Sequence, residues 1–403
     1  MSLKRQHIKI GEYIKAGFQN GIYKPAEYYS SEGTNIVRIN DYSNDGVKNF
    51  ENLKRVKLSE TEIDKFSLRQ NDILINRVNS LSHIGKSCLI DKIEDSMVFE
   101  SNMMRLRLPK TSKISSEYLF IVLNSTRSRD YFRKVAKQAV AQASINQEDV
   151  RSLGVFLPSL EQQIAIAELF FVWNQAIKKI ERLIAAKEKR YAHLVSSLIA
   201  NDSHQRGHIR DFTTEVSKRN NGAAIGRVLS VTNNRGFVLP EDQFERRVAS
   251  SDLSNYKIVT SGQYAYNPSR INVGSIARLD GWDSGVLSPM YVVFEIDDKK
   301  VNSDFFLHWL SSHEAKGRIR RSAQGSVRET VSFTDLGAIS FPMPLLYKQI
   351  EVTSILNITR KEIDLLRKQL EAYRKQKRGL LQKLLKGKWR IMEGMNKHRR
   401  CTD

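Results

Sequence analysis

The chain has 403 residues, of which 40% are apolar, so it can form two or three domains with buried cores. Its formal net charge of +21 favours polyanionic partners, nucleic acid before an anionic membrane. No apolar run is long enough to span a bilayer, the first residues hold no apolar signal core, and Cys88 and Cys401 lack metal or disulfide spacing. We therefore expect a cytoplasmic protein without disulfides.

Residues 1–157 are predicted to form a small mixed α/β domain with long polar loops. The alternating run 104–108 is typical of a strand, and a Ser-rich start leads into an apolar helix after residue 114. Arg, Asn, Gln and Ser in the loops are residue types that read base edges and grip phosphates, although ordinary solvated loops are also polar. The candidate DNA-binding residues of this segment are Arg38, Asn76, Arg77, Asn79, Lys86, Gln138 and Gln142.

Residues 158–200 are predicted to form one long helix. From Ile166 to Leu198 the apolar positions alternate at spacings of four and three, which is a heptad seam with one break at Lys187. A helix of about 40 residues is roughly 60 Å long at 1.5 Å per residue. Because the apolar stripe is narrow, it indicates a partner helix rather than a broad core.

A second mixed α/β domain is predicted for residues 201–343, beginning with a polar stretch at 201–208. Residues 72–77 align with 263–268, and a polar stretch with a glycine, Gly85 or Gly274, follows in both places. The two segments differ most in their loops, as two readers of different sequences would. The candidate DNA-binding residues of the second segment are Asn267, Arg270, Asn272, Gln324, Ser326 and Arg328.

Residues 344–391 are predicted to form a second long helix, followed by a basic tail at 392–403. Its outward face is rich in Lys and Arg, which is typical of a solvated helix face and also fits a surface near phosphates or an acidic partner.

The second half of the chain repeats the first at a constant distance. Pro344 stands 186 residues after Pro158 (344 minus 158), and Gln349 and Leu384 stand at the same distance after Gln163 and Leu198. We expect an α+β fold with an internal pseudo-two-fold repeat, in which two domains are separated by two long helices that form an antiparallel coiled coil. The alternative is that each helix packs only on its own domain.

No catalytic constellation is visible in the sequence. A Walker loop, a zincin motif and a nucleophile elbow are absent, and His204 and His208 lack further metal ligands. The run 266–269 is similar to the Asn-Pro signature of amino-methyltransferases but lacks its second proline, its aromatic residue and a glycine-rich cofactor loop. We therefore predict a protein that is not an enzyme and holds no metal or cofactor.

The openings Pro-x-Leu-x-x-Gln-Ile at Pro158 and Pro344, the twin heptad helices and the order domain-helix-domain-helix give the chain a close resemblance to a known family. Over residues 1–391 it resembles the DNA-specificity (S) subunit of type I restriction–modification systems. The resemblance implies that 1–157 and 201–343 are target-recognition domains, each reading one half of a bipartite asymmetric DNA site. It also implies that the helices 158–200 and 344–391 space these domains and dock two methyltransferase subunits.

In such a system the partner subunits supply the chemistry. The resemblance implies that S-adenosylmethionine is bound by the methyltransferase subunits, and that ATP and Mg belong to partner subunits, with restriction and translocation carried by a further subunit. The expected function is thus to direct adenine methylation and restriction to a DNA sequence. Two alternatives remain: the specificity portion of a fused restriction or methylation enzyme, and a stand-alone DNA-binding repressor.

Overall fold

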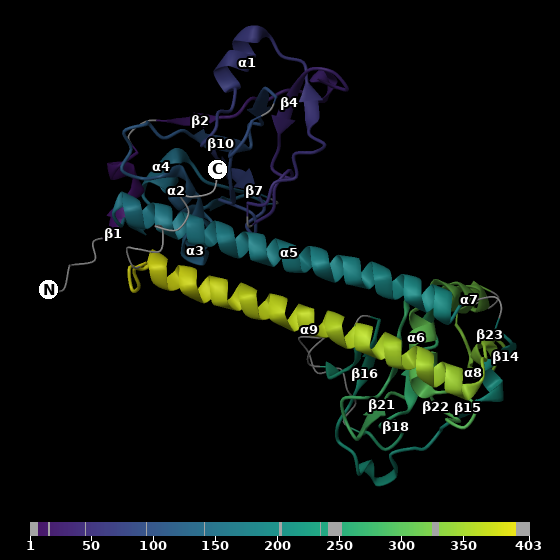
Figure 1. Ribbon diagram of the computed structural model, residues 1–403. Helices are drawn as coiled ribbons and strands as arrows, with labels where there is room; N and C mark the ends of the chain where they lie inside the picture. Colours follow the sequence, from purple (N-terminus) through teal and green to yellow (C-terminus); the bar gives the residue numbers. More distant parts are fainter. Residues whose placement is uncertain are drawn as a thin grey trace, which may run out of the picture. The chain divides into compact units, whose positions relative to one another are not determined.

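The computed structural model describes residues 7–14, 17–44, 46–93, 95–140, 142–200, 204–233, 235–240, 252–324 and 330–391. These residues form two compact units (Figure 1). One unit combines the residues up to 179 with those from 370 onward, and the other comprises residues 180–369. The long helices α5 (Leu160–Leu198) and α9 (Leu346–Leu385) each contribute one half to each unit. The predicted tail 392–403 lies outside the described residues.

The domain of the first unit is built on an antiparallel sheet in the order β2-β10-β6-β8. A second sheet, β3-β5-β4-β9, pairs β4 with β9 in parallel, and two smaller sheets have the orders β1-β13 and β11-β12-β7. The strands are β1 (His7–Lys9), β2 (Phe18–Asn20), β3 (Tyr29–Ser30), β4 (Thr34–Val37), β5 (Lys54–Val56), β6 (Ile73–Asn76), β7 (Val78–Asn79), β8 (Ser87–Leu89), β9 (Met97–Phe99), β10 (Met103–Leu106), β11 (Lys137–Gln138), β12 (Ala143–Ser144) and β13 (Gly154–Phe156). The helices are α1 (Glu60–Phe66), α2 (Ser116–Leu123), α3 (Thr126–Val135) and α4 (Gln147–Arg151).

The domain of the second unit contains an antiparallel sheet of the same connectivity, β15-β22-β19-β20. Three two-stranded sheets, β14-β23, β16-β17 and β18-β21, accompany it. The strands are β14 (Arg206–His208), β15 (Thr213–Glu215), β16 (Ser230–Thr232), β17 (Gly236–Val238), β18 (Lys257–Thr260), β19 (Tyr264–Tyr266), β20 (Ile276–Arg278), β21 (Ser284–Leu287), β22 (Val292–Ile296) and β23 (Ser340–Pro342). The helices are α6 (Ser303–Ser311), α7 (His313–Gln324) and α8 (Phe333–Gly337).

The helices that follow the two central sheets begin with equivalent caps. The side chain of Ser115 accepts the backbone N–H of Tyr118 at the start of α2, and Asn302 accepts that of Phe305 at the start of α6. Both α4 and α8 start with a reciprocal capping box. These polar groups satisfy N–H donors that a helix end otherwise leaves unpaired, which explains the Ser/Asp-rich starts in the sequence. The predicted repeat is therefore present in topology and in local chemistry.

In the first unit the two long helices pair with opposite directions and join the core of the domain. Trp173 of α5 packs edge-to-face on Tyr373 of α9, with ring centroids 5.6 Å apart. Further toward the start of α5, the side chain of Gln162 bonds the backbone of Ile391, donating to its carbonyl at 2.8 Å and accepting its N–H at 3.1 Å. Ile166 and Leu384 are buried in the same apolar cluster as the sheet residues of the domain.

In the second unit the other halves of α5 and α9 are also antiparallel. Lys187 pairs with Glu362 at 2.8 Å, and Arg360 lies 5.8 Å over the ring of Tyr191. Lys187, which breaks the seam in the sequence, is thus neutralised across the helix pair. The expected antiparallel pairing is confirmed within each unit, and both helices also pack on domain residues. Over the described residues no helix combines the length and the apolar character needed to cross a bilayer.

Candidate nucleic-acid interface

Four of the residues predicted in the first domain come together on the small sheet β11-β12-β7 or beside it. Asn79 lies opposite Ala143, Ala143 lies opposite Gln138, and the turn closes with a hydrogen bond from Ala139 N–H to Gln142 C=O at 2.8 Å. Ile145 N–H donates to the carbonyl of Arg77 at 2.9 Å. The sheet therefore joins Arg77, Asn79, Gln138 and Gln142, which are up to 65 positions apart in the sequence (142 minus 77).

The tip of the β11–β12 hairpin is exposed and its base is buried. Gln138, Val140 and Gln142 are exposed, whereas Ala143 and Ile145 belong to the apolar core. A two-stranded β-ribbon of this kind fits the major groove of B-DNA, which is about 12 Å wide. The arrangement presents two amide side chains on an anchored support, and amides can bond the adenine edge with two hydrogen bonds.

Beside this sheet an open hollow of about 380 Å³ is lined by polar residues. The lining residues are Asn20, Arg77, Asn146, Gln147, Glu148 and Arg151. The guanidinium of Arg77 donates to the carbonyl of Ser101 at 3.1 Å, and Arg151 lies 5.1 Å over the ring of Phe18. Both guanidiniums are therefore held in place by contacts within the domain.

Exposed basic residues lie on α3 and β11 of the first domain and on α7 of the second. In α3 and β11 the exposed basic residues are Arg127, Arg133, Lys134 and Lys137. In α7 they are Lys316, Arg320 and Arg321. Clustered, exposed positive charge of this kind is the pattern expected of a surface that meets phosphates.

Asn76 and Lys86, two other predicted contacts, are buried. The Asn76 carbonyl oxygen accepts the hydroxyl of Tyr42, and its Nδ2 has no hydrogen-bond partner among the described residues. Lys86 Nζ donates to the backbone carbonyl of Tyr42 at 2.8 Å and lies 4.8 Å over its ring. Burial, with Arg129 nearby, lowers the pKa of Lys86. Both side chains are buried and bond Tyr42, so in the structure they hold the loop that follows β6, and their contact with DNA stays a prediction.

Arg129 was not singled out from the sequence, yet it organises the same loop. It is buried on α3 and donates to the carbonyl of Ser82 at 2.9 Å. Arg38, which was predicted, is half-buried after β4, where its backbone N–H donates to the carboxylate of Asp41 at 2.8 Å. Only the short apolar-polar pattern of α3 could have indicated Arg129, because its partner lies 47 residues away.

In the second domain three of the predicted residues lie in the segment that follows β19. Asn267 is buried, and its side-chain oxygen accepts the N–H of Ser269 at 3.0 Å. Arg270 is exposed, and Asn272 is half-buried in the short 3-10 turn Ile271–Val273. Gly274 then has φ +98°, as Gly85 has φ +70° at the equivalent loop of the first domain. Both loops thus turn back through a left-handed glycine.

Three predicted residues lie at the end of α7 or after it in the sequence. Gln324 is the last residue of α7, and Ser326 and Arg328 lie outside the described residues. Arg270 is accordingly the one predicted side chain of this domain that is both described and clearly exposed.

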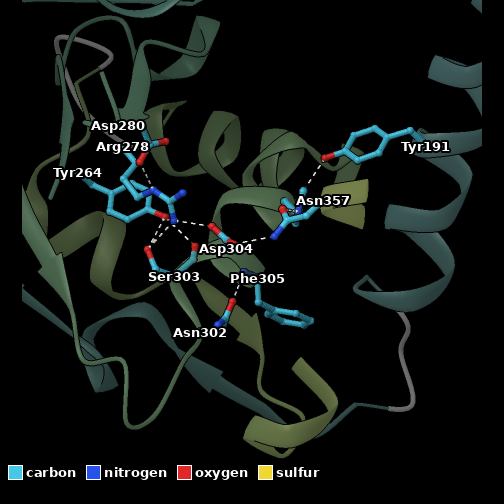
Figure 2. Close-up of polar contacts among 10 residues, drawn as sticks. Tyr191, Tyr264, Arg278, Asp280, Asn302, Ser303, Asp304, Phe305 and Asn357 are labelled. Atoms are coloured by element: carbon cyan, nitrogen blue, oxygen red, sulfur yellow. Dashed lines mark hydrogen bonds and ion pairs between the residues drawn. The ribbon is translucent and has the colours of Figure 1, made fainter. Parts of the chain in front are cut away.

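A polar network ties the second domain to both long helices (Figure 2). Arg278 on β20 pairs with Asp304 on α6 at 2.7 Å, and Asn357 on α9 donates to Asp304 at 2.7 Å. His308 on α6 bonds Asn357 at 2.8 Å and the hydroxyl of Tyr191 on α5 at 2.7 Å. Burial lowers the pKa of His308. This chain of contacts fixes the sheet edge to the helices within the second unit.

Comparison with known proteins relates the chain to one family. The family described as "Type I restriction modification DNA specificity domain" matches residues 5–188. A putative type I restriction enzyme MjaX specificity subunit of Methanocaldococcus jannaschii is 24% identical over 357 residues, which is 83% of this chain and 82% of the relative. The type I restriction enzyme StySPI specificity subunit of Salmonella potsdam is 31% identical over 164 residues, 40% of this chain and 35% of the relative.

Solved structures agree in fold. The crystal structure of a type I restriction-modification system S subunit from M. genitalium has a TM-score of 0.57 at 18% identity, covering 91% of this chain and 93% of that one. The α+β fold expected from the sequence is thereby confirmed. The relatives are named as specificity subunits of type I restriction enzymes. The chain is thus similar in sequence and in fold to the specificity subunits of type I restriction–modification systems.

Proposed function

We propose that this chain recognises a bipartite, asymmetric DNA site and directs adenine methylation and restriction by partner subunits to that site. In this proposal the first domain, residues 1–157, reads one half-site and the second, residues 201–343, reads the other. Methyltransferase subunits that carry S-adenosylmethionine perform the methylation, and restriction subunits that use ATP and Mg complete the system.

The observation that carries the proposal is the contrast between a repeated scaffold and unlike loops. The central sheets β2-β10-β6-β8 and β15-β22-β19-β20 have the same connectivity, and equivalent helices cap in equivalent ways. The exposed loops differ: the first domain presents Gln138 and Gln142 on a hairpin, and the second presents Arg270 beside a 3-10 turn. Amides suit adenine and a guanidinium suits guanine, so two such domains suit two different half-sites.

Matching apolar residues on the long helices support two equivalent docking sites for methyltransferase subunits. Ile164 and Ile350 are the same position in the two copies, and both side chains are exposed. Val172 and Ile358 are a second such pair. Exposed apolar residues on a helix surface are typical of protein interfaces. Because the pairs recur at the 186-residue offset, the same partner surface fits both, and we propose two methyltransferase subunits per chain.

The decisive experiment is genome-wide mapping of methylated adenines in a host that expresses this chain with its neighbouring methyltransferase. The expected result is one motif with two short specific halves and an unread spacer between them. A chain with the loop around Gln138–Gln142 replaced should change one half only. A contiguous motif, or methylation without any motif, would contradict the proposal, and sequence-specific binding without a methyltransferase partner would favour a repressor.

A further inference from the structure

The last part of α9 and the segment after it carry more positive charge than the equivalent part of the first half of the chain. Between residues 372 and 391 the chain has no Asp or Glu, and its basic residues are Arg374, Lys375, Lys377, Arg378, Lys383, Lys386, Lys388 and Arg390. In the first helix Lys189 corresponds to Lys375, but Ala192 and Ser197 correspond to Arg378 and Lys383. The concentration of positive charge therefore belongs to one copy and is not a requirement of the helix pair.

Part of this charge lies on one side of α9. Because successive residues of an α-helix are rotated by about 100°, Lys375, Arg378 and Lys383 fall within an arc of roughly 140°. The opposite side carries the contacts with α5: Tyr373 meets Trp173, and Lys377 lies 4.4 Å over the ring of Phe170. From Lys375 to Lys383 the helix rises by roughly 12 Å, the length of three to four base pairs.

The segment after α9 extends this basic face in a fixed geometry. Gly387 has φ +64°, and the bonds Gly387 N–H to Leu384 C=O and Lys388 N–H to Lys383 C=O, both 2.9 Å, end the helix in a Schellman motif. Lys383 Nζ lies 3.9 Å over the ring of Trp389, which is half-exposed. The bond pair between Gln162 and Ile391 then holds the segment against α5.

The basic residues of this face are not neutralised by neighbouring carboxylates. Among the described residues no ion pair involves Lys375, Arg378, Lys388 or Arg390. In the second unit, by contrast, Lys187 and Arg367 pair across the helices with Glu362 and Glu188. The end of α9 therefore keeps its positive charge available for an external anion.

We propose that Lys375, Arg378, Lys383, Lys388 and Arg390 form a phosphate-binding face that contacts the DNA backbone outside the base-reading loops. The inference rests on the proposed function, since it assumes that DNA is bound by this chain. A duplicated methyltransferase partner would use features common to both helices, whereas this face is present once. DNA is the polyanion that the family binds, and each phosphate contact adds affinity without sequence preference.

Salt dependence of DNA binding tests the proposal on the full chain. The variant combines Lys375→Gln, Arg378→Ala and Lys388→Gln, where Ala is the residue at the equivalent position of the first helix. Each lost phosphate contact makes the slope of log K against log salt shallower by about 0.9, so the three together change it by at most about 2.7. The probe is a fluorescent duplex of random sequence, titrated at several salt concentrations.

A matched control removes the same charge elsewhere: Lys178→Gln, Lys179→Gln and Lys189→Gln, all exposed on α5. We expect the α9 variant to lose at least twice as much slope as the control, with unchanged circular dichroism for both. Equal changes in both variants would show a general charge effect and overturn the proposal. An unchanged slope with lost binding to the methyltransferase would assign the face to an acidic protein and overturn it as well.

The methylation map of the same variants separates this inference from the proposed function. If the α9 variant keeps the bipartite motif of the unaltered chain, the half-site reading stands and only backbone contacts have been removed. If the unaltered chain gives no bipartite motif, the proposed function fails regardless of the salt slopes.

Discussion

Gln163 and Gln349 make the same three hydrogen bonds, each inside its own unit. The side-chain oxygen of Gln163 accepts the N–H of Ser115 at 2.9 Å, and its Nε2 donates to the carbonyls of Lys113 at 2.9 Å and Pro158 at 3.0 Å. Gln349 accepts from Asn302 at 2.9 Å and donates to Lys300 at 3.4 Å and Pro344 at 2.8 Å. Each amide ties the entrance of a long helix to the capped start of a domain helix.

Replacing either glutamine should loosen only its own domain. Gln163→Ala removes the partner of a partly buried backbone N–H next to α2, and an unpaired donor costs up to about 1–3 kcal/mol when it is buried. Hydrogen exchange should therefore accelerate in α2 with Gln163→Ala and in α6 with Gln349→Ala. The exposed Gln376→Ala on α9 is the control. Acceleration in both domain helices from one substitution would contradict the local role.

Substitutions of the exposed hairpin residue Gln142 and of the buried residue Asn76 should have different effects on DNA binding and on stability. Gln142→Ala should leave stability within about 0.5 kcal/mol, because the side chain is exposed. It should relax one half-site by about 1–3 kcal/mol per lost bidentate contact. Asn76→Ala should instead lower stability, since the buried hydroxyl of Tyr42 loses its oxygen acceptor and keeps only the weak sulfur acceptor of Met103. Binding to a library of duplexes and urea unfolding measure the two effects; a destabilised Gln142→Ala would argue against a reading tip.

Arg270 provides the corresponding test in the second domain. Arg270→Ala should weaken discrimination in the other half-site by about 1–3 kcal/mol if the guanidinium bonds a guanine, or lower affinity for all duplexes alike if it contacts a phosphate. The mapped methylation motif and the salt slope distinguish these outcomes. A change in the half-site that Gln142→Ala affects would contradict separate reading by the two domains.

A charge at either apolar helix position should block one partner subunit. Ile164→Glu and Ile350→Glu each place a carboxylate on an exposed apolar site, which opposes burial in an interface. Each single variant should bind one methyltransferase subunit and the double variant none, as measured by the mass of the complex in light scattering. Gln376→Glu is the control for an added surface charge. If the double variant still bound two methyltransferase subunits, Ile164 and Ile350 would not belong to the docking sites.

Stability should fall as pH is lowered through the ordinary pKa of histidine, 6.5, because burial lowers the pKa of His308. The unfolded chain then binds a proton that the folded chain does not, so acid favours unfolding in this window. Asp304 and Glu314 also have lowered pKa values, but as carboxyl groups they act at more acidic pH. His308→Gln should reduce the stability difference between about pH 7.5 and about pH 5.5. Hydrogen exchange of α6 measures it; an unchanged difference would contradict a role for His308.

The two long helices and their pairing could be predicted from the sequence because the second half of the chain repeats the first. A heptad seam needs only local spacing, and a constant offset identifies equivalent residues without any structure. The sequence also showed Gly85 and Gly274 in equivalent loops. Both have positive φ values, a backbone conformation that favours glycine.

The residues that contact DNA were harder to predict, because the sequence does not say whether a polar side chain points outward. Asn76 ends a strand whose other residues are apolar, and Tyr42, 34 positions earlier, turns it inward. Lys86 is buried by the same tyrosine. Gln138 and Gln142 stand on a hairpin, where exposure follows from the turn itself. Their role as base readers stays a prediction.

The contact between Gln162 and Ile391 also bears on how the protein is made. The first unit needs the chain from residue 370 onward, because Leu384 belongs to its apolar core. When only the first domain and α5 have been synthesised, the apolar surface around Ile166 therefore stays exposed until α9 emerges from the ribosome. The second unit, residues 180–369, is continuous and can close earlier. The apolar core that holds both Ile166 and Leu384 can therefore be completed only after the second unit has been synthesised.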